Sequence, residues 1–162
     1  MTARTAVRVG LSRRKLILRL RSVLPSTTQG INRAVLDVMR LARKNGCADI
    51  GKENLEIALR EALANAVIHG NRNLPHKKVV LRCYCDPERG MLIAVRDQGE
   101  GFDPDVVPDP RSAERIHLTH GRGIFLMREL MDHVEHRKGG REVVLVKRAP
   151  AARSRDRRTE GD

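Results

Sequence analysis

The stretch ENLEIALREALANAVIHGNRN (residues 53–73) carries the apolar repeat of a helix that packs one face on a core. At about 100° per residue, five apolar side chains fall on a single stripe: Leu55, Leu59, Ala62, Leu63 and Ala66. Glu61 and Asn65 are four residues apart, so their side chains are neighbours on a different face. Ile57 and Ile68 flank this pair, and we therefore expect it to lie on a partly apolar wall.

The Glu61–Asn65 pair has two interpretations. A carboxylate beside an amide on a partly apolar wall is typical of a metal or acid–base site. The same two residues also occur together as ordinary polar residues on an exposed helix face. The helix alone favours the second interpretation, so a functional assignment needs further motifs elsewhere in the chain.

Length and composition indicate one globular domain. The chain has 162 residues, of which 40% are hydrophobic, enough for a single core. The net charge of +12 is of the kind found in nucleic-acid-binding proteins. However, residues 1–22 contain seven basic residues and no acid, which leaves only +5 for the rest. Aromatic residues make up 2% of the chain, so base stacking has little to use, and direct nucleic-acid binding is not favoured.

The three cysteines, Cys47, Cys83 and Cys85, lack the four-ligand pattern of a zinc site. Cys83 and Cys85 are two apart in an apolar run and would face the same side of a strand. We interpret the cysteines as small buried hydrophobic residues. The sequence shows no secretory leader and no apolar run long enough to cross a bilayer, so we expect a cytoplasmic protein without membrane contact.

Periodicity and turn residues predict an α+β two-layer sandwich, in which about three helices cover one face of a mixed, mostly antiparallel sheet. Strands are predicted over residues 15–24, 78–85, 91–96, 132–136 and 142–148. Helices are predicted over residues 25–44, over 53–70 and from residue 121 onward. Residues 71–76 are predicted as a polar loop. The domain would span residues 15–148, between a basic arm (1–14) and a disordered tail (149–162).

Two turns rich in glycine follow the helix of residues 53–70. In DQGEGF (residues 97–102), Asp97 follows a strand, where its carboxylate can accept a hydrogen bond from an exocyclic amine. Gly99 and Gly101 allow the backbone to approach a flat ligand closely. In Gly121-Arg122-Gly123, the start of a helix offers unpaired N–H groups to a phosphate. Each turn alone is common, but the Glu61–Asn65 pair followed by both turns in this order is a specific combination. The sequence contains no GxxxxGK[ST] motif, so a nucleotide would not be held by a P-loop.

With these motifs the chain resembles the GHKL (Bergerat-fold) ATPases, and within them the anti-sigma factor serine/threonine kinases of the RsbW and SpoIIAB type. The resemblance covers about residues 15–148. It rests on three segments: EALANAVIHGN (61–71), DQGEGF (97–102) and HGRGIFLM (120–127). It implies the histidine-kinase-like ATPase fold, with ATP and Mg²⁺ as cofactors.

The resemblance also implies roles for single residues. Glu61 would be the catalytic base, Asn65 a Mg²⁺ ligand, and Asp97 the acceptor from the adenine amine. The glycines that would shape the hinges and approach the phosphates are Gly99, Gly101, Gly121 and Gly123. Residues 103–120 would form a lid over the nucleotide. Candidates for contact with the γ-phosphate are Arg111, Arg115, His120 and Arg122.

Members of this family phosphorylate a serine or threonine of a STAS-type anti-anti-sigma factor and sequester a sigma factor. The resemblance therefore implies both partners for this chain, and homodimer formation is a further expectation. The alternative is an ATP-binding protein-interaction module of the same fold without kinase activity, because a fold does not fix an activity.

Overall fold

The computed structural model describes residues 16–106 and 119–150. Its elements in chain order are β1 (Leu18–Pro25), α1 (Thr28–Lys44), α2 (Lys52–Ala64), the π-helical turn η2 (Asn65–Gly70), β2 (Lys78–Asp86), β3 (Gly90–Arg96), α3 (Thr119–Leu130), β4 (His133–Arg137) and β5 (Glu142–Arg148). The predicted arm of residues 1–14 lies outside the described residues. So does the predicted tail, except for residues 149 and 150.

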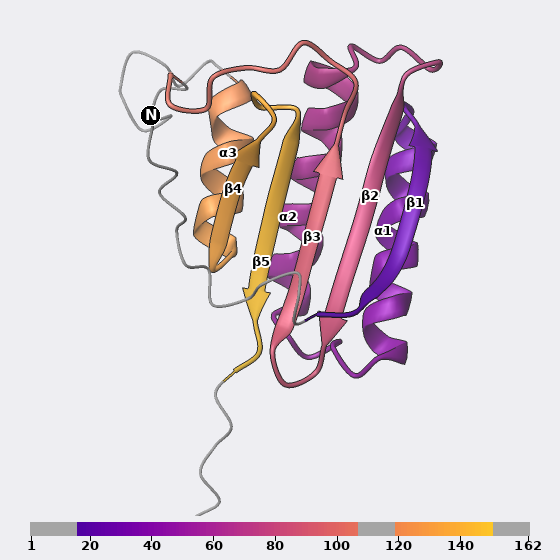
Figure 1. Cartoon of the computed structure of the whole chain (residues 1–162), viewed down its shortest axis with the longest axis vertical. Helices are drawn as coiled ribbons and strands as arrows, with labels where there is room; N and C mark the ends of the chain where they lie inside the picture. Colours follow the sequence, from indigo (N-terminus) through magenta and orange to yellow (C-terminus); the bar gives the residue numbers. More distant parts are fainter. Residues whose placement is uncertain (1–15, 107–118, 151–162) are drawn as a thin grey trace, which may run out of the picture.

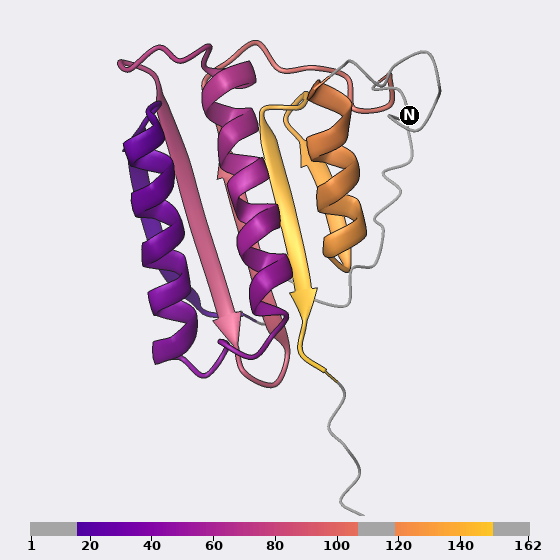
Figure 2. The same ribbon diagram turned by 180° about the vertical axis from the view of Figure 1, so that it is seen from behind.

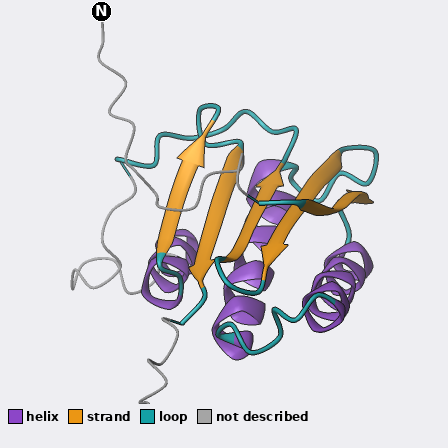
Figure 3. Ribbon diagram, turned by 60° about the horizontal axis from the view of Figure 1, so that its bottom comes forward, coloured by secondary structure: helices purple, strands orange, loops and turns teal. Residues whose placement is uncertain are grey.

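The five strands form one sheet in the order β1-β2-β3-β5-β4, which places β1 and β4 at its edges. All four neighbouring pairs run antiparallel. The helices cover one face of this sheet, behind it in Figure 1 and in front of it in Figure 2. Figure 3 shows the same two layers from one end. The predicted α+β two-layer sandwich is confirmed.

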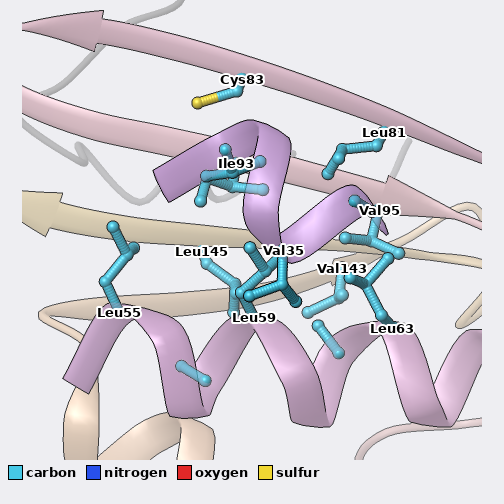
Figure 4. Close-up of a cluster of buried hydrophobic side chains, with 14 of the residues drawn as sticks. Val35, Leu55, Leu59, Leu63, Leu81, Cys83, Ile93, Val95, Val143 and Leu145 are labelled. Atoms are coloured by element: carbon cyan, nitrogen blue, oxygen red, sulfur yellow. The ribbon is translucent and has the colours of Figure 1, made fainter. Parts of the chain in front are cut away.

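Helix α2 is the central helix of the helical layer. Its predicted stripe of Leu55, Leu59, Ala62 and Leu63 is buried and packs against the sheet, as Figure 4 shows for the three leucines. The facing strands contribute residues that are also buried: Leu81, Ile93, Val95, Val143 and Leu145. These residues alternate along their strands. The residues between them in β3 and β5 form a second buried cluster with Leu16 on the opposite face of the sheet: Leu92, Ala94, Val144 and Val146. The core therefore fixes which face of α2 is left for Glu61 and Asn65.

The expectation that Ile57 and Ile68 supply the apolar wall beside Glu61 and Asn65 is wrong. Ile57 and Ile68 are 43% and 45% exposed, and neither lines the cavity described below. Both lie further round the helix from the core than Glu61 and Asn65, on the side that faces solvent. The apolar surroundings of the pair come from other residues.

The last turn of the long helix is wider than an α-helical turn. The Asn71 N–H donates to the Ala66 carbonyl at 2.8 Å, five residues back, and residues 65–70 form the π-helical turn η2. Such turns place one extra residue in the helix and often occur at functional sites. Sequence periodicity does not reveal this turn, which brings Gly70 next to Asp97.

Asn71 follows η2 and connects three segments that are distant in sequence. Its Nδ2 donates to Ser26 Oγ at 2.8 Å and to the Lys78 carbonyl at 3.0 Å. Its Oδ1 accepts from the Gln98 N–H at 2.8 Å. Asn71 lies in a loop between η2 and β2, as predicted, but its side chain is 0% exposed. A buried amide with three partners is structural.

We expect Asn71→Ala to lower the free energy of unfolding by about 3 kcal/mol, because it leaves buried partners of the amide without hydrogen bonds. Chemical denaturation measures this change. Asn32→Ala, which removes an exposed amide that accepts from Arg60 at 3.1 Å, is the matched control and should change stability by less than about 0.5 kcal/mol. Equal effects of the two substitutions would contradict the role given to Asn71.

The cysteines are buried, as predicted, but two of them are paired. Cys47, in the α1–α2 loop, forms a disulfide with Cys85 near the end of β2. Cys83 is a free thiol, and burial raises its pKa to about 12. The interpretation of Cys47 and Cys85 as merely small hydrophobic residues is therefore incomplete. The end of β2 and the loop between α1 and α2, which the disulfide joins, lie at the lower end of the sheet in Figure 1, and neither cysteine lines the cavity described next.

Candidate functional site

A cavity of about 370 Å³ lies between α2, η2 and α3 over the sheet. Its volume is in the range of small-molecule sites. Its apolar lining comes from Ala62, Ala66, Val95, Ile124, Met127 and Val143. Polar groups enter it at Asn65 and Asp97, which the sequence singled out, and at His69, Arg72, Glu100 and His136. An apolar pocket with a few polar groups is suited to a flat heterocycle with a charged extension.

Asp97 directly follows β3 and lines the cavity. Its Oδ1 accepts from the Gly99 N–H at 2.7 Å, which fixes the orientation of the carboxylate. Burial raises the pKa of Asp97, while the Gly99 N–H and the positive charges of Arg141 and Lys77 oppose this shift. A partly buried, oriented carboxylate is well suited to accept a hydrogen bond from a ligand amine.

The first glycine turn (residues 97–102) packs directly against the end of η2. A Cβ on Gly70 would lie 2.6 Å from Asp97 Oδ2, and a Cβ on Gly99 would lie 2.7 Å from the Gly70 carbonyl carbon. Both distances are too short for any side chain. Gly70 and Gly99 are therefore required so that the helix end and the strand end can meet beside Asp97.

Glu61 and Asn65 meet the second glycine turn across the α2–α3 contact. A Cβ on Gly123 would lie 2.9 Å from Glu61 Oε2 and 3.4 Å from both amide atoms of Asn65. The structure thus brings together three residues that the sequence predicted as site residues. Glu61 and Asn65 are only partly buried, and Asn65 lines the cavity. An acid and an amide therefore lie side by side at the edge of the cavity.

Helix α3 begins at Thr119, two residues before the predicted start at Gly121. Glycine is a poor helix former, which favoured a later start in the sequence. Ile124 and Met127 are buried and anchor α3 in the core. Gly121 therefore lies inside the helix, and Arg122 is exposed and does not line the cavity.

Two residues of the predicted lid (residues 103–120), residues 119 and 120, belong to α3. Residues 107–118, with Arg111 and Arg115, lie outside the described residues. Gly101 has a φ of +83°, and it lines the cavity where the chain leaves β3 toward this segment.

Within residues 16–106 and 119–150, no group of three or more His, Cys, Asp or Glu side chains is placed to hold a metal ion. Mg²⁺ does not need such a cage, because it binds through one or two protein oxygens together with the phosphates of a ligand. The Asn65 amide oxygen and the neighbouring Glu61 carboxylate are oxygen donors of the right kind. The residues present fit a Mg²⁺ ion that is shared with a phosphate ligand.

Sequence reasoning missed several residues of the site. Phe102, His136 and Gly140 line the cavity, and no sequence pattern indicated that β4 and its following turn would lie there. Gly70 was part of a motif but had no role of its own. Phe102 likewise ended the DQGEGF motif without a role of its own. For His136 and Gly140 the signal was the glycine pair 139–140, which indicates a hairpin turn without indicating what lies beside it.

No helix among the described residues is long and apolar enough to cross a membrane.

Comparison with known proteins agrees with this geometry. Residues 24–147 match the histidine kinase-like ATPase domain family, and the chain belongs to this family. The chain is similar to the anti-sigma F factor of Oceanobacillus iheyensis, with 32% identity over 50% of this chain and 56% of the relative. It is also similar to the anti-sigma F factor of Clostridium acetobutylicum, with 32% identity over 59% of this chain and 69% of the relative. The serine-protein kinase RsbW of Staphylococcus epidermidis is 25% identical over a region that covers 76% of this chain and 82% of the relative.

Proposed function

We propose that the chain is an ATP-dependent serine/threonine protein kinase that also acts as an anti-sigma factor. The observation that carries this proposal is the meeting of Glu61, Asn65 and Gly123 beside a cavity that contains Asp97. Membership of an ATPase-domain family and the names of the relatives support the same conclusion.

The adenine base would bind in the apolar part of the cavity, with its exocyclic amine directed at Asp97. The Gly99 N–H occupies Asp97 Oδ1. Oδ2 would therefore accept from the base. Val95, Val143 and Ile124 line the cavity and would pack on the ring. This arrangement favours adenine over guanine, which has a carbonyl at the position of the amine.

The phosphates would extend toward the start of α3, where Gly123 lets the helix backbone pack closely against Glu61 and Asn65. Mg²⁺, when bound, neutralises charge on the phosphate oxygens. The Asn65 amide oxygen is the protein ligand that we assign to it. Helix N-terminal N–H groups in the first turn of α3 would add further donors.

Glu61 would act as the base toward the protein substrate. Its carboxylate would take the proton of a serine or threonine hydroxyl as that oxygen attacks the γ-phosphorus. The bond between the γ-phosphorus and the bridging oxygen then breaks, and ADP leaves. Catalysis would depend mainly on positioning and charge neutralisation.

The two partners that we propose are a STAS-type anti-anti-sigma factor, which would accept the phosphoryl group, and a sigma factor, which the kinase would sequester. Both act in the cytoplasm, where we place this protein. Phosphorylation of the first partner would release the chain to bind the second.

We expect the purified chain to transfer phosphate from γ-labelled ATP to a candidate anti-anti-sigma factor, and to lose this activity when EDTA removes Mg²⁺. Gel autoradiography of the partner measures the transfer, and a serine-to-alanine variant of the acceptor residue is the control. ATP binding without a phosphorylated product from any candidate partner would instead support an ATP-binding interaction module. Absence of adenine-nucleotide binding would overturn both functions.

A further inference from the structure

The turn between β4 and β5 holds both ends of the first glycine turn. The Asp97 N–H donates to the Arg141 carbonyl at 2.9 Å, and the Phe102 N–H donates to the Gly139 carbonyl at 2.9 Å. Residues 97–102 are therefore held by one hairpin turn that lies far later in the sequence. Any shift of that turn moves the backbone of Asp97 and Phe102 together.

Close packing makes this support rigid. Gly140 has a φ of +84°, and a Cβ there would lie 2.6 Å from the Phe102 nitrogen and even closer to its carbonyl oxygen. A Cβ on Gly101 would collide with the Gly139 carbonyl oxygen. Gly139 differs, because its φ is +64° and a Cβ there would meet nothing within 4 Å. Close packing against Phe102 thus requires glycine at position 140 but not at position 139.

A side-chain contact joins the same two segments. The rings of Phe102 and His136 meet edge to face, with centroids 5.3 Å apart and planes at 70°. Such pairs contribute beyond their buried area. Both residues line the cavity, although Phe102 is 41% exposed. Burial lowers the pKa of His136, as does the positive charge of Arg128, so the ring that faces Phe102 is neutral at physiological pH.

We propose that the β4–β5 turn and His136 are a positioning element of the nucleotide site, which holds Asp97 and Phe102 at the base-binding end of the cavity. His136 sets the Phe102 ring as the wall of this end, and Gly140 sets the backbone of residue 102. This inference rests on the nucleotide-binding function proposed above. The turn acts through Asp97 and Phe102 and does not itself take part in phosphoryl transfer.

The two glycines provide a matched pair of substitutions. Gly140→Ala and Gly139→Ala both place alanine at a positive φ, but only the first displaces Phe102. We expect Gly140→Ala to weaken ATP and ADP binding by about tenfold or more, and by the same factor for both nucleotides, because the change acts at the base. Gly139→Ala keeps the carbonyl that accepts from the Phe102 N–H and adds a methyl group that meets nothing, so it should weaken binding by a clearly smaller factor. Isothermal titration calorimetry gives the dissociation constants, and thermal unfolding verifies that each variant is folded.

His136→Ala and His136→Phe test the side chain without any backbone strain. The alanine variant loses the ring contact and should raise KM for ATP about threefold to tenfold with kcat retained, whereas the phenylalanine variant should restore KM. A purely structural role would instead change stability in both variants without this difference in KM.

The outcomes separate this inference from the proposed function. If the wild-type chain does not bind adenine nucleotides, both fail. If the wild type binds them and the two glycine variants bind equally, or His136→Ala leaves KM unchanged, only the positioning role is overturned. If Gly140→Ala does not fold, the pair of His136 variants decides.

Discussion

Glu61→Gln is expected to reduce phosphotransfer about 100- to 10,000-fold, the contribution of a positioned general base. Nucleotide binding should persist, because glutamine has the shape of glutamate and still fits against Gly123 and Asn65. The loss should therefore appear in kcat while the dissociation constant of ATP stays within about twofold. Single-turnover transfer to the protein substrate and calorimetric titration with ATP measure the two quantities.

Glu56→Gln is the matched control for this substitution. Glu56 lies on the same helix, where it forms an exposed ion pair with Arg60 at 3.1 Å. Such pairs contribute little to stability, so neither activity nor folding should change appreciably. Transfer at the wild-type rate by Glu61→Gln would remove Glu61 from the mechanism, even if the kinase activity itself is established.

Asp97→Asn is expected to weaken ATP binding about 10- to 100-fold, the loss for a hydrogen bond to a charged acceptor. Asparagine Oδ1 can still accept from the Gly99 N–H, so the turn should keep its shape. The Nδ2 group would then face the donor amine of the base, where Asp97 offers an acceptor. The loss should be smaller for nucleotides whose base has a carbonyl at that position.

The same substitution should not destabilise the free protein at neutral pH. Burial raises the pKa of Asp97 above its ordinary value of 3.8. A group whose pKa is raised on folding contributes stability that is full below its unfolded pKa and is lost as the pH rises through the folded pKa. At pH 7 the charged carboxylate therefore costs stability, and the neutral amide of the Asp97→Asn variant would remove that cost. Thermal unfolding without nucleotide at pH 7 tests this, and a clear loss of stability would contradict it.

Local sequence patterns predicted most of the fold, because each element carries its own periodicity. The stripe of α2 and the alternation in β2 follow directly from which residues are apolar. Glu61, Asn65 and Asp97 could be predicted as candidate site residues because three motifs occur in a recognisable order. The fold then places Gly123 against Glu61 and Asn65, and Gly70 against Asp97.

The remaining features depend on contacts between distant segments. Nothing near Gly140 in the sequence indicates that it touches Phe102, and nothing near Cys47 indicates that it reaches Cys85. The burial of Asn71 in its loop could not be predicted, because its partners, Ser26 and Lys78 among them, come from the ends of other strands. The π-helical turn adds one residue without any change in composition. These features are set by tertiary packing, which local periodicity does not encode.

The position of β1 at the edge of the sheet has a consequence for how copies of this protein behave in concentrated solution. An edge strand offers unpaired backbone groups to a neighbouring molecule. β1 also exposes Leu18 and Val23. Arg19 and Arg21 lie between them; Arg19 is at the irregularity between Leu18 and Leu20, where its Nε donates to the Cys85 carbonyl at 3.4 Å. Two such edges would bring like charges close together, which opposes their pairing. Part of the positive charge that first suggested nucleic-acid binding thus protects solubility.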